Sequence, residues 1–191
     1  MLVVALTAVA VAFFAVGHTP MVTSGIPLPD WQTRVTKKPF GIYVTPQRSP
    51  VQPERFTGYH TGADFEVLSG EDETTLVVRA ICSGTLLQAR RASGYGGVAV
   101  QSCTIGGSPV TVIYGHLNPG GFTARVGAVL ARGDAIGPLG KGYSTQTDGE
   151  RPHLHLGIHR GTSVNIAGYV QRQTDLTAWL DPMTVVGTPL E

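Results

Sequence analysis

At residues 152–157 the chain reads Pro152-His153-Leu154-His155-Leu156-Gly157, with two histidines two positions apart in an apolar run. Residues i and i+2 of a β-strand point to the same face of the sheet, about 7 Å apart along the strand. A metal bound by one imidazole would therefore lie near the other ring without needing it as a ligand. That is the geometry of a ligand beside a catalytic base, but an ordinary strand with a polar histidine face has the same pattern.

Two further motifs change the interpretation of this pair. The chain has six histidines, and two of the others lie in His60-Thr61-Gly62-Ala63-Asp64 and Tyr114-Gly115-His116-Leu117. In this order the three motifs resemble those of the M23 (LytM, lysostaphin-like) zinc metallopeptidases, which carry H-x-x-x-D, then Tyr-x-His-Leu, then H-x-H. The resemblance covers about residues 40–165. The combination of three motifs is far more specific than any one of them.

The resemblance implies a zinc site. In the family, the His and Asp of the first motif and the second histidine of H-x-H are zinc ligands, so the matching residues here are His60, Asp64 and His155. Three protein ligands leave a fourth position open for water, as catalytic zinc sites do. The resemblance also implies that His116 and His153 form a catalytic pair beside the metal. The sequence does not tell which of these two is the general base.

Composition limits the fold class and the partners. The chain has 191 residues, of which 42% are hydrophobic and 14% charged, and its net charge of +1 gives no electrostatic hold on nucleic acid. The 25 glycines and 13 prolines favour many turns and leave little room for long helices. We therefore expect an all-β domain of antiparallel sheets with short helical turns, and the resemblance implies the LytM/M23 type of such a fold.

The N-terminus is predicted to direct export. Leu2 to Val16 is apolar except for Thr7. The run is short for a membrane span, which needs about 20 residues, but long enough for the apolar region of a secretory signal. We expect residues 1–17 to be a signal peptide or a membrane anchor that attaches the protein to the envelope, and both alternatives stay open.

A linker or loose arm is expected at residues 18–39, because this stretch mixes Pro, Thr, Ser and scattered charge. We interpret Lys37-Lys38 within it as a solvated surface step. The peptidase-like domain is then expected at residues 40–191.

The two cysteines, Cys82 and Cys103, lie in a predicted hairpin. Its strands are expected at residues 81–89 and 97–105, with a turn around Ala92-Ser93-Gly94. This register sets the cysteines opposite each other, and in an exported protein that predicts a cross-strand disulfide. A pair of buried free thiols is the alternative if the protein stays reduced.

The chain departs from the family pattern in front of the H-x-H strand. The family usually has a Ser/Thr-Gly-Pro lead-in, whereas Thr147-Asp148-Gly149-Glu150-Arg151 intervenes here, and many members carry Glu where this chain has Gly157. The insertion leaves the lip of the cleft, and so the substrate preference, open. His159 is expected about 13 Å along the strand from His155, too far to share the metal.

These features favour a zinc endopeptidase of the cell envelope, periplasmic or extracellular, and the resemblance implies the peptide part of bacterial peptidoglycan as its substrate. The resemblance does not distinguish a cross-bridge from a stem peptide. A non-catalytic LytM-like module that binds cell wall or regulates another hydrolase is the alternative. A purely structural zinc site is disfavoured, because such sites are normally closed by four protein ligands, often cysteines. The oligomeric state is left open.

Overall fold

The computed structural model describes residues 25–188. The predicted signal or anchor at 1–17 and the beginning of the predicted linker, 18–24, lie outside these residues. Twelve strands lie within the described residues, and they are β1 Tyr43–Val44, β2 Gly58–His60, β3 Gly62–Glu66, β4 Val77–Arg79, β5 Gly84–Ala92, β6 Gly96–Ile105, β7 Ser108–Leu117, β8 Val129–Leu130, β9 Ala135–Pro138, β10 His153–Arg160, β11 Tyr169–Val170 and β12 Trp179–Leu180. The helical segments are η1 Trp31–Thr33, η2 Glu73–Thr75, η3 Gln173–Ala178 and α1 Pro182–Val185.

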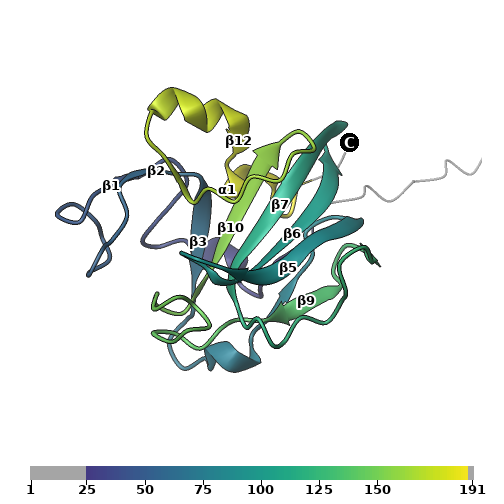
Figure 1. Cartoon of the computed structure of the whole chain (residues 1–191), viewed down its shortest axis with the longest axis horizontal. Coiled ribbons are helices and arrows are strands. Elements are labelled where there is room, and N and C mark those ends of the chain that lie inside the picture. The colour runs from purple at the N-terminus through teal and green to yellow at the C-terminus, as the bar shows by residue number, and fades with distance from the viewer. Residues whose placement is uncertain (1–24, 189–191) are drawn as a thin grey trace, which may run out of the picture.

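The central sheet has the strand order β12-β10-β7-β6-β5-β8 and is antiparallel throughout. The strands β10, β7, β6 and β5 lie side by side across the middle of the molecule (Figure 1). Strands β3 and β12 both pair with the outer edge of β10, β3 along its first half and β12 near its end. Two smaller sheets, β1-β2-β11 and β4-β9, complete the fold.

The longest hairpin, β6–β7, has a local cause in the sequence. Gly106 and Gly107 connect its strands, and their φ angles of 54° and 68° suit a two-residue turn that other residues rarely adopt. The apolar, β-branched run from Val110 to Ile113 then continues as β7, which is buried on both faces. This strand delivers His116 to one end of the sheet.

The predicted fold class is confirmed. All the strand pairings in the described residues are antiparallel, and α1, with four residues, is the only α-helix among them. No helix within residues 25–188 has the length and apolar character that a membrane span requires.

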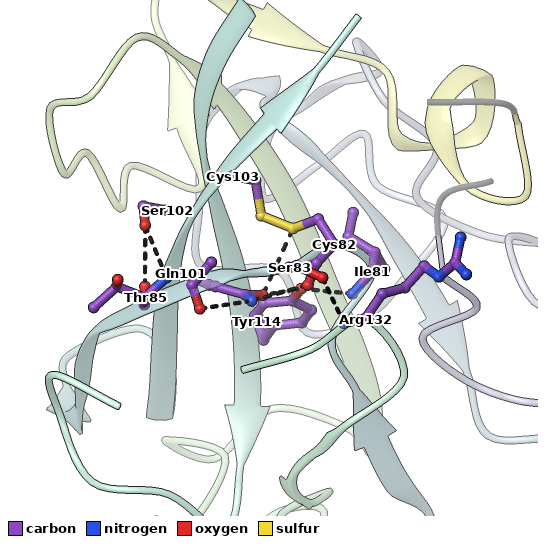
Figure 2. Close-up of a disulfide and its surroundings, with 10 residues drawn as sticks. Ile81, Cys82, Ser83, Thr85, Gln101, Ser102, Cys103, Tyr114 and Arg132 are labelled. Carbon is purple, nitrogen blue, oxygen red and sulfur yellow. Dashed lines mark hydrogen bonds between the residues drawn. A yellow bond between two sulfur atoms is a disulfide. The ribbon is translucent and has the colours of Figure 1, made fainter. Parts of the chain in front are cut away.

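The predicted cysteine bridge is present in the structure. Cys82 and Cys103 are joined with a Cα–Cα distance of 6.0 Å, although β5 begins only after Cys82. Figure 2 shows the bridge beside Gln101 and Tyr114. The Tyr114 hydroxyl accepts a hydrogen bond from the Ile81 amide at 3.0 Å and donates to Gln101 Oε1 at 3.1 Å. The tyrosine of the Tyr-x-His-Leu motif therefore has a structural role, because its buried hydroxyl links β6 to the segment that carries Cys82.

We expect titration of unfolded, unreduced protein to find no free thiol. The bridge closes a loop with a sequence separation of 21, so it should contribute on the order of 3 kcal/mol on the chain-entropy model. A Cys82→Ala/Cys103→Ala double variant, compared with wild type by denaturant unfolding, should lose about that much stability. Two free thiols in the wild-type protein would contradict the bridge.

The N-terminal segment is not a loose arm where the structure describes it. Within residues 25–39, the Pro27 carbonyl accepts a hydrogen bond from the Arg79 amide at 3.0 Å. The carbonyls of Arg34 and Lys38 accept from the amides of Glu66 and Asp64 on β3, both at 3.0 Å. The segment covers the free edge of β3, so the expectation of a linker is wrong for residues 25–39. Composition alone could not reveal these backbone partners.

The prediction that Lys38 lies on a solvated surface is also wrong. It is 2% exposed, forms an ion pair with the buried Glu54 and donates to the Tyr169 hydroxyl at 3.1 Å. A lysine is fully buried almost only when it is paired, and here the partner lies in the following loop. Its neighbour Lys37 does fit the prediction, with a side chain that is 46% exposed.

Replacing Lys38 by Met should destabilise the protein by about 3 kcal/mol, because it leaves the Glu54 carboxylate buried without its cation. The matched variant Lys37→Met should cost at most about 1 kcal/mol. Burial raises the pKa of Glu54, but its hydrogen bond with Lys38 and further contacts hold it below 4.5. The stabilisation by the Lys38–Glu54 pair is therefore present above the ordinary pKa of a glutamate and is lost as the pH falls through the lowered pKa of Glu54. The loss of stability caused by Lys38→Met should therefore be smaller in acid. Equal deficits for the two variants in denaturant unfolding would contradict the buried pair.

Candidate metal centre

His60 and Asp64 are brought together by two short strands that follow one another directly. β2 ends at His60, and β3 begins at Gly62 and carries Asp64. A Cβ at Gly62 would lie 2.4 Å from the backbone oxygen of Leu156 and 2.8 Å from the His155 imidazole. The glycine of the H-x-x-x-D motif therefore lets β3 approach β10 closely enough for the two motifs to meet.

Strand pairing then brings His155 to the first motif, since His155 is the register partner of Asp64 across β3 and β10. His60 Nε2 lies 3.0 Å from His155 Nδ1, and both nitrogens lie 3.2 Å from Asp64 Oδ1. A tetrahedral site with zinc–ligand bonds of about 2.0–2.2 Å has edges of about 3.3–3.6 Å between its ligand atoms. The three donor atoms thus nearly form one face of such a tetrahedron.

The protonation of these side chains suits a metal. His60 Nδ1 lies 3.2 Å from the carbonyl oxygen of Pro39, which can only accept, so the proton sits on Nδ1 and Nε2 presents its lone pair. Burial lowers the pKa of His155 to about 4, although its hydrogen bond to Asp64 acts in the opposite direction. At neutral pH His155 is therefore uncharged, the form that binds a metal ion.

Asp64 supplies the negative charge of the group. Burial alone would raise the pKa of Asp64, but the imidazoles of His153 and His60 hold it well below its ordinary value of 3.8. The three residues His60, Asp64 and His155 are only 1%, 2% and 4% exposed. Two imidazoles and one carboxylate are donors that zinc accepts, so the residues present fit this ion.

The two histidines predicted to act beside the metal lie next to each other and next to this donor group. The ring centroids of His116 and His153 are 4.3 Å apart. His153 Nε2 lies 3.3 Å from Asp64 Oδ2, the carboxylate oxygen turned away from His60 and His155. His116 has a φ of 61°, a left-handed conformation that costs a non-glycine residue energy and often marks functional sites. The structure therefore brings all five predicted residues together.

A cavity of about 310 Å³ opens over these residues. Asp64, His116, His153 and His155 are among its lining residues. The rings of Phe56, Tyr95 and Tyr169 form the aromatic part of the remaining wall, and Tyr169 stacks on Phe56 at a centroid distance of 5.2 Å. A pocket with an apolar wall and a few convergent polar groups is the usual form of a substrate site.

Comparison with protein-family models matches residues 58–166, more than half of the chain, to Peptidase family M23. The chain belongs to this family. Its matched region holds all five predicted site residues, the disulfide and the central sheet except β12, whereas the segment that covers β3 lies outside it. None of the curated protein sequences matches the chain.

Solved structures show the same fold. The catalytic domain of lysostaphin, an antimicrobial peptidase from Staphylococcus simulans, is 22% identical, with 78% of this chain and 88% of that chain covered and a TM-score of 0.52. CbpA from L. salivarius REN is 26% identical over 86% and 94% of the two chains, with a TM-score of 0.57. The SpoIIQ–SpoIIIAH pore-forming complex is matched at 18% identity over 89% and 94%, with a TM-score of 0.59.

The structure adds residues to the site that sequence reasoning did not assign. Arg151, from the insertion in front of the H-x-H strand, is 4% exposed and bonds Asp64. Tyr95 is 6% exposed, and its ring centroid lies 5.4 Å from that of His155. The sequence held one signal for Arg151, which is its place two residues before His153, in front of the apolar run that was expected to form a strand. His159, by contrast, packs edge-on against Trp179 at 4.8 Å and takes no part in the donor group.

Proposed function

We propose that this protein is a zinc-dependent endopeptidase that hydrolyses peptide bonds of bacterial peptidoglycan, in a cross-bridge or a stem peptide. The observation that carries the proposal is the triangle of His60 Nε2, Asp64 Oδ1 and His155 Nδ1, with sides of 3.0–3.2 Å, at the base of a cleft in an M23 chain. The M23 motif set supports the substrate class.

The residues around the donor group have distinct tasks in this reaction. A zinc ion held by His60, Asp64 and His155 would supply a Lewis acid that activates water for attack on a peptide carbonyl. His153 Nδ1 lies 2.9 Å from the Arg151 carbonyl oxygen, so this nitrogen keeps its proton and Nε2 is the atom that accepts or returns one. Burial lowers the pKa of His116 well below its ordinary value, so this imidazole enters the reaction uncharged at pH 7.

We also propose that the protein acts outside the cytoplasm, in the cell envelope or beyond it. The apolar segment Leu2 to Val16 supports export. The bridge between Cys82 and Cys103 supports an oxidising compartment, where disulfides form and persist. If the apolar segment is retained, it attaches the domain to the membrane.

Digestion of purified peptidoglycan tests the proposal. The full chain is incubated with walls of several chemotypes, and the released fragments are analysed by mass spectrometry. We expect new amino and carboxyl termini at one peptide linkage, loss of the reaction with a chelator and its return with Zn²⁺. Binding to the wall without any fragment release would contradict the enzyme and favour the non-catalytic LytM-like module.

A further inference from the structure

We propose that Arg151 is a positioning residue of the metal centre, which holds one oxygen of Asp64 so that only the other oxygen is offered to the metal. The inference rests on the proposed function, because it takes His60, Asp64 and His155 as ligands. It assigns a task to the insertion in front of the H-x-H strand, which the family motif does not contain.

The two oxygens of Asp64 face different partners. Oδ1 lies 3.2 Å from His60 Nε2 and 3.2 Å from His155 Nδ1, so it belongs to the donor triangle. Oδ2 accepts a hydrogen bond from Arg151 Nη2 at 2.9 Å. Both side chains are buried, and a charge-assisted hydrogen bond in such surroundings holds the carboxylate in one orientation.

Glu66 fixes Arg151 in turn. It lies two residues after Asp64 on β3, so both side chains point to the same face of the strand. Arg151 Nη2 donates to Glu66 Oε1 at 2.5 Å, and Arg151 Nε donates to Glu66 Oε2 at 3.0 Å. Lys37 approaches the same carboxylate at 3.3 Å. The planar guanidinium is therefore clamped by two carboxylates and cannot swing away from Asp64 without breaking several bonds.

Without Arg151, Asp64 Oδ2 would lose its cationic partner. It could then become a second ligand to the metal, which would occupy the position that a catalytic site leaves open. His153 Nε2, 3.3 Å from Oδ2, approaches the same oxygen, but it does not replace the charge of the guanidinium. By binding Oδ2, the guanidinium keeps Asp64 a one-atom ligand.

The usual lead-in of the family does not offer this arrangement. A glycine stands before the proline there, and a glycine has no side chain that reaches the metal ligand. Here Arg151 stands before Pro152. The loop that carries it is fastened to the rest of the rim by Arg55, which bonds Glu150 Oε1 at 2.8 Å and Asp148 Oδ2 at 3.0 Å.

Metal binding tests the proposal independently of catalysis. Zinc affinity is measured by competition with a chelator, and the Co²⁺-substituted protein is examined by its visible absorption, which reports coordination number. Loss of an outer partner of a ligand typically weakens metal binding 10–100-fold. We expect Arg151→Gln to lose about that much affinity and to change the Co²⁺ spectrum, and Arg151→Lys, which keeps one donor, to recover part of both.

Two further variants separate positioning from general stabilisation. Arg151→Met/Glu66→Gln removes the unpaired carboxylate that could unfold the single variant, and it should still bind zinc weakly. Arg55→Gln loosens the same loop without touching Asp64, and its zinc affinity should equal that of wild type. Wild-type affinity in the double variant, or an equal loss in Arg55→Gln, would overturn the positioning role.

The wild-type protein distinguishes failure of this inference from failure of the proposed function. If wild type binds no stoichiometric zinc, the metal centre itself is wrong and the inference falls with it. If wild type binds zinc and Arg151→Gln binds it equally well with an unchanged Co²⁺ spectrum, only the role of Arg151 is overturned.

Discussion

The His155→Ala variant should lose most of its bound zinc and all of its peptidase activity. His155 supplies Nδ1 to the donor triangle, at 3.0 Å from His60 Nε2 and 3.2 Å from Asp64 Oδ1. Two remaining ligands do not hold zinc at a catalytic site, which uses three protein ligands and one open position. Elemental analysis of the purified variant and peptidoglycan hydrolysis, measured on the same preparation, check both losses.

His159→Ala is the matched control for this variant. It removes another imidazole from the same strand, β10, but this ring packs on Trp179 and not in the donor group. Its zinc content should therefore equal that of wild type. Full zinc occupancy in His155→Ala would show that the ligand assignment is wrong, whatever the activity.

Local patterns carried the prediction of the site. The spacing within H-x-H sets both rings on one face of β10, and the motif at residues 60–64 spans the junction of β2 and β3. The hairpin beside the disulfide was predictable in outline, because its turn and both its strands are contiguous in sequence. Its register was not, because Ala89 pairs with Ala99 and Cys82 lies before β5. In each case the decisive contacts follow from strand geometry over a few residues, and the resemblance to M23 supplied the pairing between distant motifs.

Charges with distant partners could not be predicted in this way. Arg151 and Asp64 are 87 residues apart, and Lys38 meets Tyr169 across 131 residues. When the partner of a charged residue is not known, the sequence alone predicts that the residue lies on the surface, because burial of an unpaired charge is costly. The segment at residues 25–39 was misjudged for the same reason, since its backbone partners lie on β3 and β4.

His116→Ala and His153→Ala should keep zinc but lose rate. Both rings lie beside the donor triangle, 4.3 Å from each other, and neither supplies an atom to it. The loss of a general acid or base typically lowers the rate 10²–10⁴-fold. We therefore expect zinc content close to wild type and a fall in hydrolysis within that range for each variant.

The same assay on His116→Ala, His153→Ala and His155→Ala decides between acid–base catalysis and metal binding. A lost ligand removes metal and activity together, whereas a lost proton-transfer group removes activity alone. His153→Ala is the more stringent test of the assignment. His153 Nε2 lies 3.3 Å from Asp64 Oδ2, and the predicted ligand His155 is only two positions further along the strand. If His153→Ala loses zinc while His155→Ala keeps it, the two roles are exchanged. If all three variants hydrolyse peptidoglycan as wild type does, the peptidase mechanism at this centre is wrong.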